Sequence, residues 1–272
     1  MTRLGQHFLT DPRILGRIAD AVEPTAFDVI LEIGPGRGSL TEILLSRGAS
    51  VIGVETDRRL IDGLRLRIAD CGLGRAEIVE GDALKLDWHL LLERHLVNPQ
   101  SAIRSPQFKI AGNIPYAITS PLIEKALQPP LPERVVFLVQ AEVADRIAAP
   151  PGSKAYGALS VGVQASCRVE KLLRVAPGAF RPPPKVHSTL LRLVPLAEPL
   201  VPPAEAPALR AFVTACFGRR RKQLRNVVAG VTGRPVTEVA DGLAALGLDP
   251  AARPETLAPP DFVRLLRWSR QL

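Results

Sequence analysis

Four consecutive residues near the middle of the chain, Asn113-Ile114-Pro115-Tyr116, combine groups that can bind an amine on a flat ring. The side-chain oxygen of Asn113 can accept one N–H of such an amine, and a carbonyl held by Pro115 can accept another. The ring of Tyr116 can stack on the base that carries the amine. An amine whose lone pair is delocalised into a ring needs positioning and electrostatics rather than a strong base. In isolation, the same four residues also fit an ordinary turn with a packed tyrosine.

A glycine-rich segment, EIGPGRG from Glu32 to Gly38, follows an apolar run and precedes an amphipathic stretch. Glycines at such a junction let the backbone turn tightly and approach a ligand closely. The dinucleotide fingerprint G-x-G-x-x-G requires a third glycine where this chain has Ser39, so the segment does not match it. The observed order, an acidic residue followed by G-x-G-x-G, is typical of Rossmann-like methyltransferases. This segment therefore predicts a site for S-adenosylmethionine.

Two further carboxylates follow successive apolar runs. Glu55 ends the second run, and a carboxylate there can accept bonds from both ribose hydroxyls of a bound nucleoside. Asp82, in the sequence Gly81-Asp82-Ala83, follows the third run and can accept a bond from an adenine amine. Taken singly, the two residues also fit a solvated strand end and an aspartate in a turn. Three such features after three successive runs favour one shared site.

The elements that must position these groups alternate along the first two thirds of the chain. Strands separated by amphipathic helices predict a mostly parallel sheet with helices on both faces, which is an α/β, Rossmann-like methyltransferase fold. We expect helices at Leu40–Arg47, Arg58–Asp70 and Pro121–Leu127. The expected strands are Asp28–Ile33, Ser50–Val54, Ala76–Glu80, Phe108–Ala111, Val135–Val139, Lys171–Val175 and Thr189–Val194.

A proline-rich segment, PLAEPLVPPAEAP from Pro195 to Pro207, cannot continue a helix or a central strand. We therefore expect an S-adenosylmethionine-binding catalytic domain over residues 1–195, a linker over 196–207 and a small basic helical domain over 208–272. The helices expected in the second domain are Ala208–Leu224, Thr237–Leu246 and Pro260–Arg270. Residues 93–106 are polar and irregular and predict a surface loop.

Positive charge is concentrated near the C-terminus. The formal net charge is +8, and residues 200–272 carry 11 Lys and Arg against 6 Asp and Glu, which leaves +5 there. The basic run around Arg221 has no acidic residue between Arg210 and Arg234. On a helix, Arg221 and Arg225 would share one face and would suit RNA phosphates. A solvated helix face paired with acidic neighbours is the alternative.

Other features of the composition exclude several classes of protein. The three cysteines lie far apart and form no CxxC pair, and the four histidines do not cluster, so we expect no metal site. No apolar run approaches the roughly 18 residues of a membrane span, so we expect no membrane partner. The first residues, MTRLGQHFLTDP, lack the apolar centre of a signal peptide, so we expect a cytoplasmic protein.

These segments together resemble the KsgA/RsmA family of ribosomal RNA adenine dimethyltransferases, which is related to the Erm methyltransferases. The resemblance covers nearly the whole chain. GQHFL at Gly5–Leu9 is similar to the family segment that lies over the cofactor, and FRPPPKV at Phe180–Val186 is similar to its FxPPPKV loop. PGSKAYGALSV at Pro151–Val161 is typical of KsgA rather than Erm, and RRKQLRN at Arg220–Asn226 resembles the family's RRKxLRN segment.

The resemblance implies roles for individual residues. Phe180 is expected to stack on the flipped target adenine opposite Tyr116. The implied catalytic set is therefore Asn113, Pro115, Tyr116 and Phe180. The implied cofactor-binding set is His7, Leu9, Gly34, Gly36, Glu55, Asp82 and Asn113. The implied RNA-binding set is Lys154, Lys185, Arg219, Arg220, Arg221, Lys222 and Arg225.

The resemblance also implies a reaction. Two adjacent adenosines, in a hairpin near the 3′ end of small-subunit ribosomal RNA, each receive two methyl groups from S-adenosylmethionine, which becomes S-adenosylhomocysteine. The expected partner is that RNA within a ribosomal subunit or an assembly intermediate, and we expect a monomeric enzyme. The alternatives are an Erm-type enzyme that acts on large-subunit RNA and an assembly or transcription factor that keeps the fold for nucleic-acid binding. A dehydrogenase is disfavoured by the position of the third glycine and by the NIPY loop.

Overall fold

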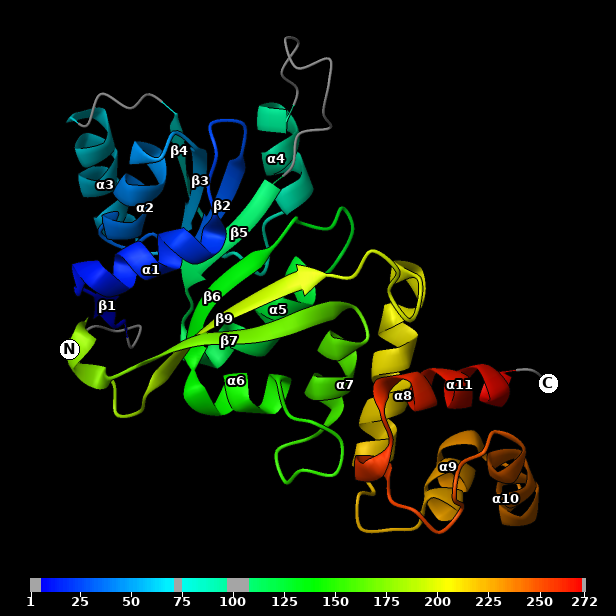
Figure 1. Cartoon of the computed structure of the whole chain (residues 1–272). Helices are drawn as coiled ribbons and strands as arrows, with labels where there is room; N and C mark the ends of the chain where they lie inside the picture. The colour runs from blue at the N-terminus through cyan, green and yellow to red at the C-terminus, as the bar shows by residue number, and fades with distance from the viewer. Residues whose placement is uncertain (1–5, 71–74, 97–107, 271–272) are drawn as a thin grey trace. The chain divides into compact units, whose positions relative to one another are not determined.

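The computed structural model describes residues 6–70, 75–96 and 108–270, and its contacts divide the chain into two compact units (Figure 1). The first unit comprises Met1–Ala144 and Glu170–Pro195, and the second comprises Asp145–Val169 and Leu196–Leu272. Residues 145–169 thus pack with the C-terminal part of the chain, whereas the sequence prediction placed them in the catalytic domain. Most of the surface loop expected over residues 93–106 lies outside the described residues.

The strands form one large sheet and one small one. The large sheet has the order β4-β3-β2-β5-β6-β9-β7, and the small one pairs β1 with β8. Neighbours from β4 to β6 are parallel, and β9 runs antiparallel to β6. The strands are β1 (Phe8–Leu9), β2 (Val29–Ile33), β3 (Ser50–Glu55), β4 (Ala76–Glu80), β5 (Phe108–Asn113), β6 (Val135–Gln140), β7 (Cys167–Val175), β8 (Phe180–Arg181) and β9 (Ser188–Pro195).

The helices follow the strands in the α/β order expected of this fold, and those of the C-terminal part come after β9. None of the described helices has the length and apolar character needed to cross a membrane. The helices are α1 (Pro12–Val22), α2 (Ser39–Ser46), α3 (Arg58–Asp70), α4 (Trp88–Leu96), α5 (Thr119–Ala126), α6 (Ala141–Ile147), α7 (Ala158–Gln164), α8 (Ala206–Phe217), α9 (Leu224–Thr232), α10 (Val236–Ala245) and α11 (Pro259–Arg270).

The central strands are mostly apolar because a parallel sheet is covered on both faces, with Glu32 in β2 and Lys109 in β5 as buried charged exceptions. All five residues of β2 are buried, and so are the last five of β3. Side chains alternate between the two faces, so Ile30 and Glu32 point to the same side of β2. Ile30 belongs to the hydrophobic cluster with α1 and α2 on this side of the sheet. Glu32 therefore points toward the same two helices.

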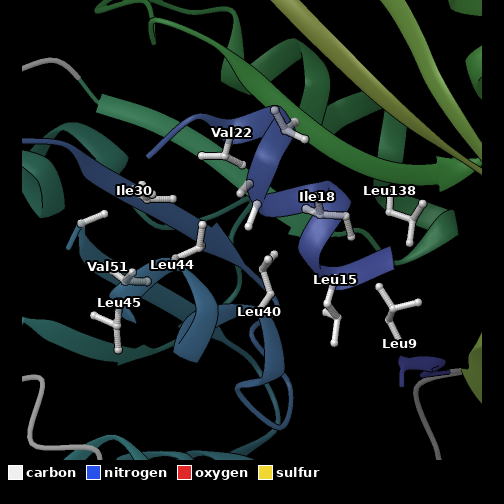
Figure 2. Close-up of a cluster of buried hydrophobic side chains, with 14 of the residues drawn as sticks. Leu9, Leu15, Ile18, Val22, Ile30, Leu40, Leu44, Leu45, Val51 and Leu138 are labelled. Carbon is white, nitrogen blue, oxygen red and sulfur yellow. The ribbon is translucent and has the colours of Figure 1, made fainter. Parts of the chain in front are cut away.

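One hydrophobic cluster joins α1 and α2 to this face of the sheet (Figure 2). Ile18 of α1 and Leu44 of α2 are fully buried against Ile30 and Val51 of the strands. Burial of one such side chain contributes roughly 1.5–3 kcal/mol. On the other face, Trp88 and Leu92 of α4 line a hollow together with Ile110 of β5. Helices therefore cover both faces of the sheet, as the sequence predicted.

A buried lysine joins the starts of the strands at the edge opposite their carboxyl ends. Lys109 in β5 is 3% exposed, and its Nζ lies 2.7 Å from Asp28 Oδ2 and 3.6 Å from Glu133 Oε2. The same ammonium donates to the carbonyl of Glu23 at 2.6 Å. These contacts neutralise a charge that would otherwise be costly to bury. They also connect the residues that precede β2 and β6 to β5.

The second unit has its own core, which includes Tyr156, Phe212 and Phe262. The hydroxyl of the buried Tyr156 donates to the carbonyl of Leu257 at 2.8 Å, so the segment before α7 is bonded to the segment before α11. Within the expected linker, α8 begins at Ala206. Pro207 does not prevent this, because a proline in the first turn removes no intrahelical hydrogen bond.

Candidate active site

A cavity of about 350 Å³ lies in the first unit beside the carboxyl ends of β2 and β5, within the usual size range of small-molecule sites. The segment around β1, the glycine-rich loop, the end of β3 and the loop after β5 form its walls. The structure therefore brings together groups that are far apart in the chain, such as His7 and Tyr116. The predicted residues that line the cavity are His7, Leu9, Gly34, Gly36, Glu55, Asn113, Pro115 and Tyr116.

Two glycines keep the cavity walls close together. Gly36 has a φ of +59°, which side chains rarely adopt, and a Cβ there would lie 3.2 Å from the ring of Phe8. At Gly112 a Cβ would lie 2.4 Å from the carbonyl oxygen of Ile33, which leaves no room for a side chain. The end of β5 can therefore approach the end of β2 closely enough to set Asn113 beside the glycine loop.

Glu55 is held in place by backbone amides. Its Oε2 accepts from the N–H of Gly36 at 3.0 Å, and its Oε1 accepts from Thr56 and Asp57 at 2.8 and 2.9 Å. A carboxylate has about four acceptor positions, so one is left after these three bonds. Glu55 is 6% exposed and lines the cavity, where that position suits a hydroxyl donor.

Glu32 is a second acidic residue at the cavity, and the sequence reading gave it no role of its own. It is 1% exposed, and its Oε2 accepts from the hydroxyl of Thr41 in α2 at 2.6 Å. Burial raises the pKa of Glu32 to about 7; the bond from Thr41 opposes this rise and the charge of Glu55 adds to it. The sequence contains a pattern that could have indicated this bond. Glu32 comes shortly before the glycines of the loop, and Thr41 lies in the first turn of the helix that follows it.

The amide of Asn113 has one defined orientation in the cavity wall. Its Nδ2 donates to the carbonyl of His7 at 2.8 Å, and this bond assigns the amide nitrogen to the His7 side. The Oδ1 atom accepts no hydrogen bond from the described residues. The residue thus presents a fixed acceptor at the cavity, which is the group that an amine N–H requires.

Tyr116 lies beside this acceptor. Its hydroxyl and that of Ser188 are 2.8 Å apart, and its ring stacks on the ring of His7 with centroids 6.1 Å apart. The His7 ring is fixed in turn, because its Nδ1 lies 2.8 Å from the carbonyl oxygen of Pro182. The FRPPPKV loop therefore contacts the cavity wall through the bond between Pro182 and His7. Ser188, the first residue of β9, contacts the wall through Tyr116, a role that no local pattern signalled.

Two predicted site residues lie outside the cavity wall. Phe180 is completely buried and belongs to the hydrophobic cluster around Leu9, because the pairing of β8 with β1 directs it inward. In this structure its ring is not available to a base. Asp82 is half-buried, and its Oδ1 accepts from the N–H of Leu84 at 2.9 Å within its own turn. The stacking role of Phe180 and the cofactor contact of Asp82 stay predictions.

Comparison with known protein families decides what kind of site this is. Residues 1–264 match the ribosomal RNA adenine dimethylase family. The chain belongs to this family. Its members are S-adenosylmethionine-dependent enzymes that methylate adenine in ribosomal RNA.

Individual relatives cover nearly the whole chain. Ribosomal RNA small subunit methyltransferase A of Pseudomonas aeruginosa is 42% identical over 99% of this chain and 94% of its own length. The protein of the same name from Geobacter sulfurreducens is 41% identical over 97% of this chain and 93% of its own. Among solved structures, a dimethyladenosine transferase from Plasmodium falciparum is similar with a TM-score of 0.79 and 29% identity, covering 95% and 96% of the two chains. The 23S rRNA methyltransferase ErmE is similar with a TM-score of 0.69 and 28% identity over 97% and 100%.

The basic segment that resembles the family's RRKxLRN motif does not form one helix. The helix predicted over Ala208–Leu224 is present as α8 but ends at Phe217, so its predicted end is wrong. Residues 218–223 form turns between α8 and α9, and Arg221 and Arg225 do not share a helix face. The first amides of α9 are bonded elsewhere, since Leu224 donates to the carbonyl of Ala252 and Arg225 to that of Pro250. These long-range bonds stabilise the start of α9, so α8 can end at Phe217 and a new helix can begin at Leu224.

The seven predicted RNA-binding residues differ in what they contact. Arg220 pairs with Glu255 at 2.9 Å and donates to the carbonyls of Lys154 and Ser153, so it holds the second unit together. Arg219 lies over Gly230 of α9. Lys154, Arg221 and Lys222 are exposed and form no ion pair with the described residues, and Arg225 is half-buried. Lys185 is also exposed but belongs to the first unit.

Proposed function

We propose that this protein transfers methyl groups from S-adenosylmethionine to the exocyclic amines of two adjacent adenosines in the 3′-terminal hairpin of small-subunit ribosomal RNA. The observation that carries the proposal is the fixed Asn113 amide, whose Oδ1 is left as an acceptor in the same cavity wall as Glu55. Family membership supports the chemistry, and the names of the relatives support the small subunit as substrate.

The residues of the cavity fit the cofactor. Glycines at 34 and 36 remove side chains where a ligand would contact the backbone, and the remaining acceptor position of Glu55 suits a ribose hydroxyl. Leu9 and Leu15 supply apolar walls, as nucleoside sites require. When bound, S-adenosylmethionine supplies an electrophilic methyl group on its sulfonium. The described residues contain no group of three or more metal-ligand side chains.

The chain's own residues position the amine. Asn113 Oδ1 accepts one N–H, and the carbonyl of Ile114, restrained by Pro115, accepts the other. The carbonyl of Pro115 itself accepts from the N–H of Ile118 and is not needed for this. Holding both N–H bonds directs the nitrogen lone pair toward the methyl group, while Tyr116 stacks on the base. The target adenine must leave its RNA helix to reach this cavity.

The RNA is held by charge. A net charge of +8 attracts a polyanion, and exposed Lys154, Arg221 and Lys222 offer cations in the second unit that form no ion pair within the described part of the chain. Lys185 would add a phosphate contact from the first unit. We propose that the protein acts as a monomer on a ribosomal subunit or assembly intermediate in the cytoplasm, and that the modification belongs to small-subunit biogenesis.

The test uses small ribosomal subunits that lack the modification, together with radiolabelled S-adenosylmethionine. We expect label in dimethyladenosine, with two methyl groups on each of two adjacent residues. Label only in large-subunit RNA would favour an Erm-type enzyme, to which the similarity with ErmE also points. Bound cofactor without label in either subunit would contradict the proposed reaction and favour an assembly factor.

Replacing Glu55 by alanine should weaken cofactor binding by roughly 10- to 100-fold, because a hydrogen bond to a charged group contributes about 1.5–3 kcal/mol. The variant also leaves the amides of Gly36, Thr56 and Asp57 without their acceptor, so its unfolding free energy is expected to fall as well. Calorimetric titration with S-adenosylhomocysteine measures the affinity. Glu80→Ala, an exposed glutamate at the end of β4, is the matched control, and equal affinity in both variants would remove Glu55 from the site.

Removing the exposed cations of the turn should reduce the salt dependence of RNA binding. For Arg221→Ala/Lys222→Ala we expect the slope of log affinity against log salt to fall by roughly 1.4–1.8, since each lost phosphate contact removes about 0.7–0.9. Cofactor affinity should not change. The control is Arg267→Ala/Arg270→Ala, which removes the same charge from exposed positions of α11. Equal slopes for the two double variants would contradict a local role for the turn.

A further inference from the structure

The proposed mechanism leaves one buried acidic group at the cavity without a task. Glu32 is 1% exposed at the end of β2, and its side chain is directed toward α2 by the alternation of the strand. It receives a single hydrogen bond, from Thr41, and forms no ion pair with the described residues. An apolar side chain would fill this position at lower cost, because burying a charge without a partner is unfavourable.

The charges around Glu32 do not compensate it. Glu55 in β3 lines the same cavity and is itself acidic. Arg37 lines the rim, but it is exposed and its guanidinium lies over the ring of Phe8 at 4.9 Å. The other titratable groups that line the cavity are His7 and Tyr116. Leu40 of α2 and the lining residues of α1 are apolar. The cavity thus holds two acidic groups with no cation paired to Glu32.

Burial raises the pKa of Glu32 to about 7, and the nearby charge of Glu55 adds to this effect. A carboxyl with such a pKa is partly protonated at neutral pH. A cation that enters the cavity stabilises the ionised form, and by linkage the proton leaves as the cation binds.

We propose that Glu32 discriminates the cofactor from its product by charge, losing its proton when S-adenosylmethionine binds and keeping it when S-adenosylhomocysteine binds. The inference rests on the proposed function, since it assumes that this cavity takes the cofactor. S-adenosylmethionine carries a sulfonium charge that S-adenosylhomocysteine lacks. Only the O–H bond of the Glu32 carboxyl breaks, and its proton goes to solvent.

For turnover, the consequence is that the protein binds the product S-adenosylhomocysteine more weakly than it binds S-adenosylmethionine. Methyl transfer moves the positive charge from the sulfur to the amine nitrogen, and the methylated amine then loses a proton to solvent and becomes neutral. The Glu32 carboxylate is then left buried without a counter-charge. The carboxylate then takes a proton from solvent, and the attraction that favoured the cationic form is lost. A reaction that consumes several cofactor molecules per RNA benefits from such release.

Calorimetric titration of the whole protein tests this at pH 6, 7 and 8, in buffers of different ionisation enthalpy. For the wild type we expect the affinity for S-adenosylmethionine to rise roughly tenfold from pH 6 to pH 8, with release of about half a proton at pH 7. The affinity for S-adenosylhomocysteine should change by less than about threefold. Glu32→Gln should lose both the pH dependence and the proton release, and its preference for the cationic ligand should fall.

Two further variants separate Glu32 from other causes. Thr41→Val removes the hydrogen bond that the carboxylate accepts among the described residues, which raises the Glu32 pKa further and shifts the affinity profile to higher pH. His7 also lines the cavity, so His7→Gln is the control for any contribution of that side chain to the proton release. We expect His7→Gln to keep the proton release. If Glu32→Gln does not fold, two measurements still test the role of Glu32. They are the number of protons released when the wild type binds the cofactor and the pH shift of the affinity profile in Thr41→Val.

Each outcome has a definite meaning. Binding of both ligands with equal pH dependence, or proton release that persists in Glu32→Gln, would overturn the role of Glu32 and leave the proposed function intact. Proton release that disappears in His7→Gln would also overturn it. Absence of any binding to the wild type would overturn both this inference and the proposed cofactor site.

Discussion

Asn113→Ala will lower the rate of methyl transfer by roughly 100- to 1000-fold, the usual effect of removing one hydrogen-bonding group that acts on the transition state. The variant lacks the Oδ1 acceptor, so the amine nitrogen is no longer directed at the methyl group. Single-turnover methylation of small subunits measures the rate. Gln128→Ala removes an exposed amide from the same unit and is the control.

The structure adds a second expected effect of Asn113→Ala. The lost Nδ2 no longer holds the carbonyl of His7, which connects the segment around β1 to the cavity. Loss of one such bond contributes about 0.5–1.5 kcal/mol, so cofactor affinity should fall by only about 2- to 10-fold. Unchanged turnover would refute the role of Asn113. A loss of rate explained entirely by weaker cofactor binding would instead make it a residue that closes the site.

Lys109→Ala is expected to lower the unfolding free energy by about 3–5 kcal/mol, because it leaves the buried carboxylate of Asp28 without its counter-charge. Such a loss is a large part of the total stability of an ordinary domain. Urea unfolding followed by circular dichroism measures it. Arg13→Ala, which removes one partner of an exposed ion pair with Asp11, should leave the midpoint close to that of the wild type.

A second variant distinguishes charge from packing at Lys109. Asp28→Leu/Lys109→Met replaces both charges by apolar groups and should recover much of the stability lost in Lys109→Ala. If the double variant is as unstable as the single one, the cause is lost packing or the hydrogen bond to Glu23 rather than the uncompensated charge.

The large sheet could be predicted from sequence because its strands are covered on both faces. Continuous apolar runs such as Val29–Leu31 and Val135–Val139 identify strands without knowledge of their partners, and the structure confirms the fold that they imply. The pairing of β1 with β8 could not be predicted, because two-residue strands have no periodicity. Their pairing depends on contacts between residues about 170 positions apart.

The site was predictable where its residues follow strands. Glu55 and Asn113 end β3 and β5, and the carboxyl ends of neighbouring parallel strands meet at one edge. Phe180 shows where this reasoning stops, since its motif gives no information about which way a short strand turns its side chain. The break at 218–223 was missed for a similar reason. Arginine and lysine favour a helix locally, and the contacts that oppose it come from Glu255 and Ala252.

The bond between Arg220 and Glu255 has a consequence for protein engineering. Arg220 also donates to the carbonyls of Ser153 and Lys154, and Tyr156 is bonded to Leu257, so the C-terminal helices and residues 145–169 form one folded piece. A chimera that exchanges only the helices after the proline-rich segment between two relatives would separate these partners. An exchange of the second unit between family members therefore has to move both segments, 145–169 and 196–272, together.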